Sequence, residues 1–254
     1  MAIYVTSDAH GHVRALDEAL SKISLTSDDT LYVLGDMIDR GPDPVGVIKL
    51  VRSLPNARVL KGNHEQIMLD AIIGQDPLDA ETWDINGGWT TRQQLNDMEF
   101  EAYEELVRWM ATLPLYAVVE TDERPYLLVH AGIQTEAARA FLLEHGVDCA
   151  DGTGAVDADR ELLKQMLAVQ SSDDLLWIRH GYWDAPTGLL SAEGKGPVVV
   201  SGHTPTVSLG RYCEVGGLAG LDEESGRGRM VRLGGEDTAG VPDRIDIDCA
   251  AATG

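Results

Sequence analysis

The stretch that decides the fold reads Leu31-Tyr32-Val33-Leu34-Gly35-Asp36-Met37-Ile38-Asp39-Arg40-Gly41-Pro42. Its first four residues form an uninterrupted apolar run, which predicts a strand buried on both faces. Gly35 then allows the backbone to turn, and two carboxylates and a guanidinium follow. In open α/β sheets, ligands bind at the carboxyl ends of such strands. Asp-Arg-Gly-Pro alone also fits a salt-bridged turn, so the rest of the chain must decide between the two interpretations.

The same order of strand, polar loop and helix occurs earlier in the chain. Residues 3–6 predict a first strand, and Asp8 and His10 follow it directly. On extended backbone, side chains two residues apart point to the same side, and a carboxylate with an imidazole suits a divalent metal. Asp8 also fits a helix N-cap, but we favour the ligand interpretation for Asp8 and His10. His12 is expected to be a surface residue in the first helical turn.

A third unit of this kind follows. Residues 57–60 predict a strand, and Asn63 and His64 come shortly after it. Asn63 fits a helix N-cap, since Gln66 follows three residues later, but its amide oxygen could also bind a metal without adding negative charge. A histidine next to a metal-bound substrate is a natural general acid. We therefore expect His64 to donate a proton and Asp39 to orient it.

Two later strands also end in histidines. Residues 125–129 and 198–200 predict buried strands, which are followed by His130 and His203. A lone histidine after a strand is more often structural, but the repetition of the pattern favours metal binding. The candidate ligands offer nitrogen or oxygen and no sulfur, which suits two cations of the Mn²⁺, Fe or Zn class bridged by Asp36. The candidate ligands are Asp8, His10, Asp36, Asn63, His130 and His203.

The segments between these motifs predict helices and loops. Residues 76–113 form an insert in which Trp83 and Trp89 flank an Asn-Gly-Gly turn. These tryptophans fit either a cap near a cleft mouth or aromatic anchors of a small helical insert, and both alternatives stay open.

The remaining segments carry weaker signals. Arg179, beyond an apolar segment, fits an ordinary surface arginine. Residues 214–237 are rich in glycine and charge and are expected to be mobile in part. Further helices are predicted at 100–113, 134–143 and 159–169, and late strands at 230–233 and 244–248.

Composition and charge limit the classes of function. The 254-residue chain carries 42 acidic and 20 basic residues, a net charge of −22. Such a surface repels nucleic acids and anionic membranes, so neither is expected as a partner, and an anionic substrate then requires a positive centre such as a metal. The 3 cysteines form no Cys-x-x-Cys pair, no apolar run reaches the length of a membrane span, and the amino terminus lacks a signal sequence. We therefore expect a soluble, cytoplasmic protein with reduced thiols.

Five motifs occur in a specific order: Asp8-x-His10-Gly11, Gly35-Asp36-x-x-Asp39-Arg40-Gly41, Gly62-Asn63-His64-Glu65, His130-Ala131-Gly132 and Gly202-His203-Thr204. This set resembles the calcineurin-like metallophosphoesterases, in particular the phosphoprotein-phosphatase branch with its small bacterial and phage members. The resemblance extends from residue 7 to about residue 248 and implies an α/β fold, a four-layer αββα sandwich in which two mixed sheets are flanked by helices. It also implies one domain over residues 1–254, with a small helical cap insert around residues 76–113.

The resemblance further implies a dinuclear metal centre. The implied ligands are Asp8, His10 and Asp36 for one ion, and Asp36, Asn63, His130 and His203 for the other. We expect Mn²⁺ in preference to Fe, Zn, Ni or Co, and a water activated by the two ions for direct attack on phosphorus. His64, paired with Asp39, resembles the acid that protonates the leaving oxygen. Arg40, Arg179 and Asn63 resemble the residues that bind the phosphate.

These features predict a metal-dependent hydrolase of phosphomonoesters, with Ser/Thr-phosphorylated protein or a small phosphoester as substrate. The alternative is a symmetrical bis(5'-nucleosyl)-tetraphosphatase, which shares the ligands at the strand ends. Members of that group usually lack the residue equivalent to Asp39 and carry Gly-Asn-His-Asp, where this chain has Glu65. A metal-binding scaffold with a dead site is a third alternative, but it is expected to lack a ligand or His64. Residues 246–254 resemble the entry to the family's last strand, and the chain ends there.

Overall fold

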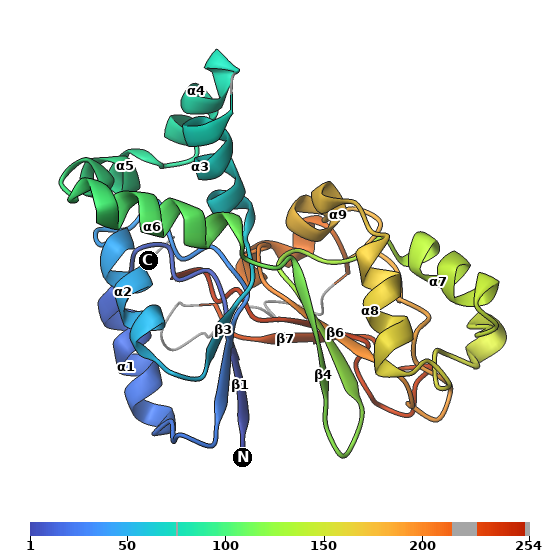
Figure 1. Ribbon diagram of the computed structural model, residues 1–254. Coiled ribbons are helices and arrows are strands. Elements are labelled where there is room, and N and C mark those ends of the chain that lie inside the picture. The colour runs from blue at the N-terminus through green and yellow to red at the C-terminus, as the bar shows by residue number, and fades with distance from the viewer. Residues whose placement is uncertain (75, 215–227, 252–254) are drawn as a thin grey trace. The chain divides into compact units, whose positions relative to one another are not determined.

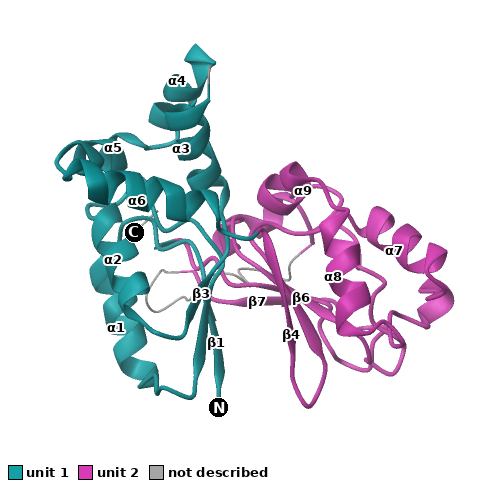
Figure 2. Ribbon diagram, viewed as in Figure 1, with its two compact units in different colours: residues 1–114, 251–254 teal, residues 115–250 magenta. Residues whose placement is uncertain are grey.

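The computed structural model describes residues 1–74, 76–214 and 228–251. The chain divides into two compact units, unit 1 with Met1–Pro114 and Ala251–Gly254, and unit 2 with Leu115–Ala250 (Figure 2). Each unit carries one β-sheet and helices of its own (Figure 1). Two sheets flanked by helices confirm the predicted α/β fold class.

The sheet of unit 1 positions the first part of the candidate site. Its described strands are β1 (Ile3–Thr6), β2 (Thr30–Val33) and β3 (Ala57–Val59). They run parallel in the order β1-β2-β3, and their register pairs Ile3 with Thr30 and Leu31 with Ala57. The apolar run of the deciding stretch is β2, which is buried beyond its first residue. Because the strands are parallel, their carboxyl ends lie at one edge of the sheet, where the polar loops follow.

Two helices connect these strands. α1 (Val13–Ile23) leads from β1 to β2, and α2 (Pro44–Ser53) leads from β2 to β3. α2 begins where the sequence predicts, because the Asp43 carboxylate accepts the Gly46 N–H at 2.9 Å and proline occupies the first helical position. Both helices contribute to one apolar core with the sheet. This core includes Leu16, Leu31, Val33, Val47 and Ile48.

The segment predicted as an insert, residues 76–113, is helical. β3 is followed by α3 (Asn63–Ile73), and the insert then contains α4 (Pro77–Ile85), α5 (Trp89–Asn96) and α6 (Phe100–Ala111) (Figure 1). The two tryptophans differ, since Trp83 on α4 is 3% exposed and Trp89 at the start of α5 is 58% exposed. Trp83 is therefore an internal anchor, whereas Trp89 lies on the surface.

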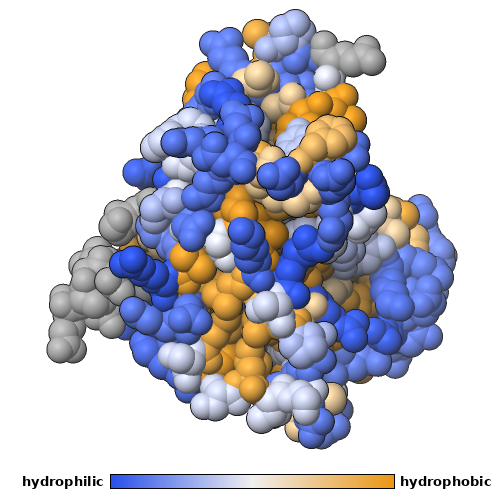
Figure 3. Space-filling model, turned by 60° about the vertical axis from the view of Figure 1, so that its left-hand side comes forward, coloured by the Kyte–Doolittle hydropathy of each residue, from blue (hydrophilic) through white to orange (hydrophobic). Residues whose placement is uncertain are grey.

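The first helix of the insert and the end of α3, which precedes the insert, expose apolar side chains. Leu78 and Ile85 on α4 and Ile73 at the end of α3 are all more than half exposed. Figure 3 shows apolar areas among the hydrophilic residues near the top of its view, at the height of α4. A further apolar area lies in the middle and lower part of this view, and hydrophilic residues surround it (Figure 3).

The sheet of unit 2 is mixed. Its described strands are β4 (Tyr116–Glu120), β5 (Pro125–Val129), β6 (Val198–Ser201), β7 (Val231–Leu233) and β8 (Arg244–Asp246). They lie in the order β4-β5-β6-β8-β7, with β5, β6 and β8 parallel and the two edge strands antiparallel to their neighbours. The late strands are shorter than predicted. Of the segment predicted to be mobile, residues 215–227 lie outside the described residues.

Helices of unit 2 pack on this sheet through a second apolar core. They are α7 (Thr135–Glu144), α8 (Arg160–Ala168) and α9 (Ser172–Trp177), with short 3₁₀ helices at Ala150–Gly152 and Thr206–Arg211. The core joins Leu142 of α7 and Leu163 of α8 to the strand residues Leu127 and Val199. Within the described part of the chain, no helix combines the length and the apolar character that a membrane span requires.

Candidate metal and catalytic site

Backbone hydrogen bonds connect the loop after β1 to the loop after β2. The N–H of Asp8 donates to the Gly35 carbonyl at 3.2 Å, and the N–H of His10 donates to the Asp36 carbonyl at 2.9 Å. The sequence-based expectation of extended backbone at residues 8–10 is wrong. Asp8 has a φ of 54° and His10 a φ of 41°, so both lie in the left-handed region. The physical reason is the sharp turn that each loop makes at the edge of the sheet in order to reach the other.

Left-handed backbone is concentrated at the predicted site residues. Ten described non-glycine residues have positive φ, and six of them are among the predicted metal, acid and phosphate-binding residues. The six are Asp8, His10, Asp36, Asp39, Arg40 and His203. Each such residue costs on the order of 1–3 kcal/mol and persists only where the surrounding structure holds it. Strain of this kind clusters at functional sites, which supports a functional interpretation of these loops.

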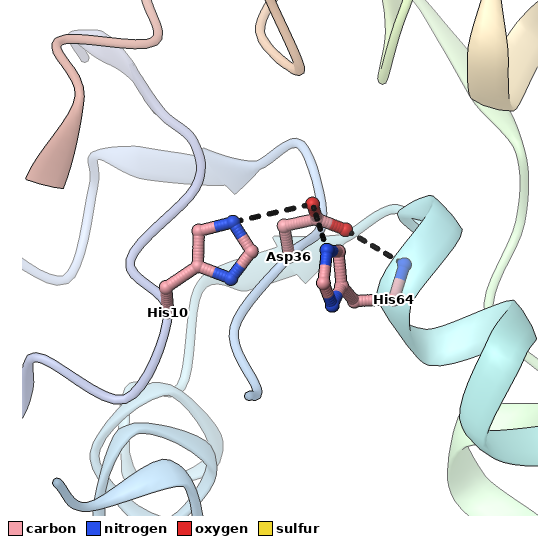
Figure 4. A group of neighbouring side chains, drawn as sticks. All are labelled: His10, Asp36 and His64. Carbon is pink, nitrogen blue, oxygen red and sulfur yellow. Dashed lines mark hydrogen bonds and ion pairs between the residues drawn. The ribbon is translucent and has the colours of Figure 1, made fainter. Parts of the chain in front are cut away.

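A buried carboxylate lies between two histidines. His10 Nε2 is 3.5 Å and His64 Nε2 is 3.9 Å from Asp36 Oδ2 (Figure 4). All three residues are at most 2% exposed, and their ligand atoms lie within 4.8 Å of one another. Burial, and then the charge of Glu65, raise the pKa of Asp36 well above its ordinary value. A cation placed here would offset both effects, so the donor set fits a divalent metal.

Hydrogen bonds fix the ring orientation of His10. Its Nδ1 lies 2.8 Å from the Ile38 carbonyl, which can only accept, so Nδ1 carries the proton. Nε2 of the neutral ring then has a lone pair, and it accepts from Arg40 Nη1 at 3.0 Å. A histidine that donates one ring N–H to a carbonyl and presents the other nitrogen is the usual arrangement of a metal ligand.

Asp8 and Asn63 are also buried and belong to the same unit. Asp8 is 2% exposed and receives a hydrogen bond from the Ser7 hydroxyl. Asn63 is 3% exposed and is the first residue of α3. The group whose ligand atoms come together in unit 1 is therefore His10, Asp36 and His64, and the ligand roles of Asp8 and Asn63 stay predictions.

His64 and Asp39 form a buried pair. His64 Nδ1 is 2.7 Å from Asp39 Oδ2, and both side chains are 0% exposed. Burial raises the pKa of Asp39 from 3.8 to about 6, although hydrogen bonds from Thr91 and Trp83 lower it. On the other side of the ring, His64 Nε2 lies 2.7 Å from Nη2 of the exposed Arg40. The predicted acid, its carboxylate partner and the predicted phosphate-binding arginine are thus in direct contact.

Glu65 supports this site in a way that the sequence interpretation missed. Its fully buried carboxylate accepts backbone N–H groups of Asp36 at 2.8 Å, Met37 at 2.9 Å and Gly62 at 2.8 Å. The alternative in which Asn63 caps the helix and pairs with Gln66 does not hold, because Gly62 is the cap of α3 and Glu65 reaches back to it. An acidic residue at the third position of a helix was the available signal.

The later candidates all belong to unit 2. His130 follows β5 and is 0% exposed, and His203 follows β6 and is 6% exposed. Their ring centroids are 5.0 Å apart, so unit 2 brings this predicted pair together. Trp177 meets His203 edge-on at 5.8 Å. Arg179 follows α9 and is half-buried, and its carbonyl accepts the N–H of Trp183 at 3.1 Å.

Comparison with known proteins identifies a family and several relatives. The family described as calcineurin-like phosphoesterase matches residues 1–227. A symmetrical bis(5'-nucleosyl)-tetraphosphatase of Proteus mirabilis is 29% identical over 220 residues, which cover 84% of this chain and 68% of that protein. The protein of the same name from Erwinia tasmaniensis is 32% identical over 136 residues, which cover 52% of this chain. That match spans 45% of the Erwinia protein, so the chain covers about half of this relative's length.

One solved structure shares the fold over nearly the whole chain. It is a crystal structure of a candidate diadenosine tetraphosphatase, and the match covers 99% of this chain and 85% of that one, with a TM-score of 0.52. At 18% identity, this likeness is one of fold alone.

Proposed function

The chain belongs to the calcineurin-like phosphoesterase family, and on that premise we propose that it is a metal-dependent hydrolase of phosphomonoesters. The proposed substrates are phosphoesters whose leaving group is an alkoxide, as in Ser/Thr-phosphorylated protein. An alkoxide is a poor leaving group, so its departure depends strongly on a proton from the enzyme. The observation that carries the proposal is the buried contact of 2.7 Å between His64 and Asp39.

His64 has the geometry of a general acid. The Asp39 carboxylate holds its Nδ1, which leaves Nε2 as the nitrogen that delivers the proton to the leaving oxygen. The negative charge of Asp39 also stabilises the imidazolium form that carries this proton. Loss of a general acid typically slows a reaction about 10²–10⁴-fold, so this pair accounts for a large part of the catalysis we propose.

Arg40 couples phosphate binding to this proton. Its guanidinium now donates to the ring nitrogens of His10 and His64 at 3.0 and 2.7 Å. A phosphate offers several stronger acceptors, and the planar guanidinium can bind two of them at once. When Arg40 turns to the phosphate, it stops donating to Nε2 of His64, and Nε2 can then hold the proton. We propose that substrate binding and readiness of the acid are linked in this way.

The family implies divalent metal ions, and the donor set in unit 1 fits one of them. His10 and Asp36 are the residues we propose as direct ligands there, with His64 close by. When bound, the metals supply positive charge and an activated water for attack on phosphorus. Mn²⁺ is the proposed ion. Bound cations would supply the local positive charge by which a chain with a net charge of −22 attracts an anionic substrate. The full ligand sets at the two metal positions remain predictions.

The second candidate function is a symmetrical bis(5'-nucleosyl)-tetraphosphatase. It is favoured by the relatives of that name, which are 29% and 32% identical to this chain. In that reaction a nucleoside diphosphate leaves, and it is stable as an anion. A general acid therefore contributes less to tetraphosphate cleavage than to hydrolysis of an alkyl phosphate.

The test uses metal-stripped protein reconstituted with Mn²⁺. Turnover is measured in parallel on p-nitrophenyl phosphate, a phosphothreonine peptide and diadenosine tetraphosphate. Faster turnover of the phosphopeptide is the expected result. Dominant cleavage of the tetraphosphate would replace the proposal with the second candidate. No turnover of any of the three by the metal-loaded protein would overturn both and favour a scaffold with a dead site.

A further inference from the structure

We propose that Trp83 and Thr91 of the helical insert are positioning residues that hold Asp39 against His64 and so prepare the general acid. The inference rests on the proposed function, in which His64 protonates the leaving oxygen. Neither residue reaches the reacting atoms in this account, because both act through Asp39. Trp83 lies 44 residues and Thr91 52 residues from Asp39 along the chain, so the insert closes around the loop after β2.

The Thr91 hydroxyl contacts Asp39 twice. It accepts the backbone N–H of Asp39 at 2.9 Å and donates to Oδ1 of the same residue at 2.6 Å. One hydroxyl thereby fixes the backbone and the side chain of Asp39 together. Asp39 needs such support because its φ of 69° lies in the left-handed region, which is unfavourable for a residue with a side chain.

Trp83 completes the arrangement around the carboxylate. Its Nε1–H lies 3.1 Å from both Oδ1 and Oδ2 of Asp39. Oδ1 therefore accepts hydrogen bonds from both Trp83 and Thr91 of the insert. Oδ2 points toward His64 Nδ1, which lies 2.7 Å away. The indole is itself held in place, because a Cβ at Gly88 would lie 2.2 Å from the Trp83 ring. The turn between α4 and α5 thus packs directly against the residue that donates to Asp39.

The same turn also contacts Arg40. The Gly87 carbonyl accepts the Arg40 N–H at 3.0 Å, and a Cβ at Gly87 would lie 2.9 Å from Arg40 Cγ. Residues 83–91 therefore support the two neighbouring residues to which we assign the acid's partner and the phosphate contact. A segment that only stabilised the fold would not need to direct polar groups at both of them.

Electrostatics distinguishes positioning from simple packing. A buried carboxylate is unfavourable unless hydrogen bonds and nearby positive charge stabilise it, and an apolar residue at this position would avoid that penalty. Trp83 and Thr91 supply donors only to the oxygens of Asp39 and to no other described carboxylate. Their removal should therefore weaken the proton donor more than the rest of the site.

The test is the dependence of kcat/KM on the leaving group. Thr91→Val removes the hydroxyl at nearly constant shape and Thr91→Ser keeps it, whereas Trp83→Phe removes the N–H donor together with part of the buried ring. For each Mn²⁺-loaded variant, kcat/KM is measured on a series of phosphomonoesters. The leaving groups of the series range from a good one, 2,4-dinitrophenol, to a poor one, an alkyl alcohol. Thr90→Val is the matched control, since Thr90 is also buried but makes only a long contact of 3.4 Å to a carbonyl.

We expect Thr91→Val and Trp83→Phe to lose about tenfold or more in kcat/KM on the alkyl phosphate, and not more than the 10²–10⁴-fold that general-acid catalysis contributes in total. On 2,4-dinitrophenyl phosphate the loss should be less than about threefold, because that leaving group needs no proton. Thr91→Ser should retain the wild-type kcat/KM on the alkyl phosphate. The metal content should be the same in all variants. Equal losses on all leaving groups, or no rescue by serine, would overturn the positioning role.

A second measurement does not depend on turnover. The proton between His64 Nδ1 and Asp39 Oδ2 should give a strongly downfield NMR signal in the wild type, because the bond is short and charge-assisted. Thr91→Val should shift or lose this signal, and Thr91→Ser should keep it. An unchanged signal in Thr91→Val would contradict the inference. A wild type that is inactive on every phosphomonoester would instead overturn the proposed function.

Discussion

The side-chain carboxylate of Glu65 accepts the backbone N–H of Asp36 at 2.8 Å. The same carboxylate accepts N–H groups from Met37 and Gly62, so it joins the loop after β2 to the start of α3. Asp36 lies between His10 and His64, and its backbone is held by the Glu65 carboxylate. The site is held together by backbone contacts as much as by its functional side chains.

We expect Glu65→Gln to destabilise the metal-loaded protein. The amide group of glutamine would direct a donor at backbone N–H groups, which are donors themselves, and an unsatisfied buried donor costs about 1–3 kcal/mol. For a protein of this size the Tm should fall by roughly 2–4 °C per kcal/mol. The control is Glu105→Gln, whose carboxylate is exposed and pairs with Arg52 at the surface. Equal Tm values for Glu65→Gln and wild type would contradict this account of the loop.

Gly35 is predicted to tolerate no side chain. A Cβ there would lie 2.3 Å from the backbone nitrogen of Gly62, so Gly35→Ala would force the loop after β2 away from α3. Gly146→Ala is a matched control, since Gly146 has a similar φ of 86° but nothing within 4 Å of its Cβ position. Gly146→Ala should cost only about 1–2 kcal/mol for left-handed backbone. Chemical denaturation should therefore show a larger loss of stability for Gly35→Ala, and similar losses would refute the close approach.

The pH profile should report the ionisation of Asp39. Its pKa of about 6 means that the carboxylate gains a proton, and loses its hold on His64, as the pH falls through this value. Activity on an alkyl phosphate should therefore decline as the pH falls below about 6. The charged or titratable groups that face Asp39 are Arg40 and His64. The Thr91 hydrogen bond lowers this pKa, so Thr91→Val should move the acid limb to higher pH. A limb that stays in place would argue against Asp39 as the titrating group.

Arg40 should act on substrate binding through its planar geometry. Arg40→Lys keeps the charge but loses the paired donors that a phosphate accepts, so we expect KM to rise about tenfold. Arg40→Ala should raise KM further. Arg52→Lys, on the exposed surface of α2, serves as the control and should leave the kinetics unchanged. If Arg40→Lys binds substrate as well as the wild type, the guanidinium is not the phosphate ligand.

Much of the site could be predicted from the ends of the strands. The apolar run before Gly35 marked β2, and parallel strands place their following loops at one edge, which brought His10, Asp36 and His64 into one group. The contact between Asp39 and His64 also agrees with the sequence prediction. These placements share a cause, because strand periodicity and the order of polar motifs are both local signals.

The supporting residues could not be predicted in the same way. Thr91 is one threonine among several in the chain, and only the packing of the insert brings it to Asp39. Trp83 fitted two interpretations, and its burial was decided by tertiary contacts that no local pattern encodes. The left-handed backbone of Asp8 and His10 was missed because these residues ordinarily favour other conformations. Hydrogen bonds to distant segments override that preference here.

The central claim is that His64 is the general acid of a phosphomonoesterase. It is tested most directly by kcat/KM of Mn²⁺-loaded His64→Asn on a phosphothreonine peptide, with His145→Asn, an exposed histidine, as the matched control. We expect His64→Asn to fall about 10²–10⁴-fold below the wild type and His145→Asn to equal it. A His64→Asn variant that binds metal and retains wild-type kcat/KM would contradict the claim.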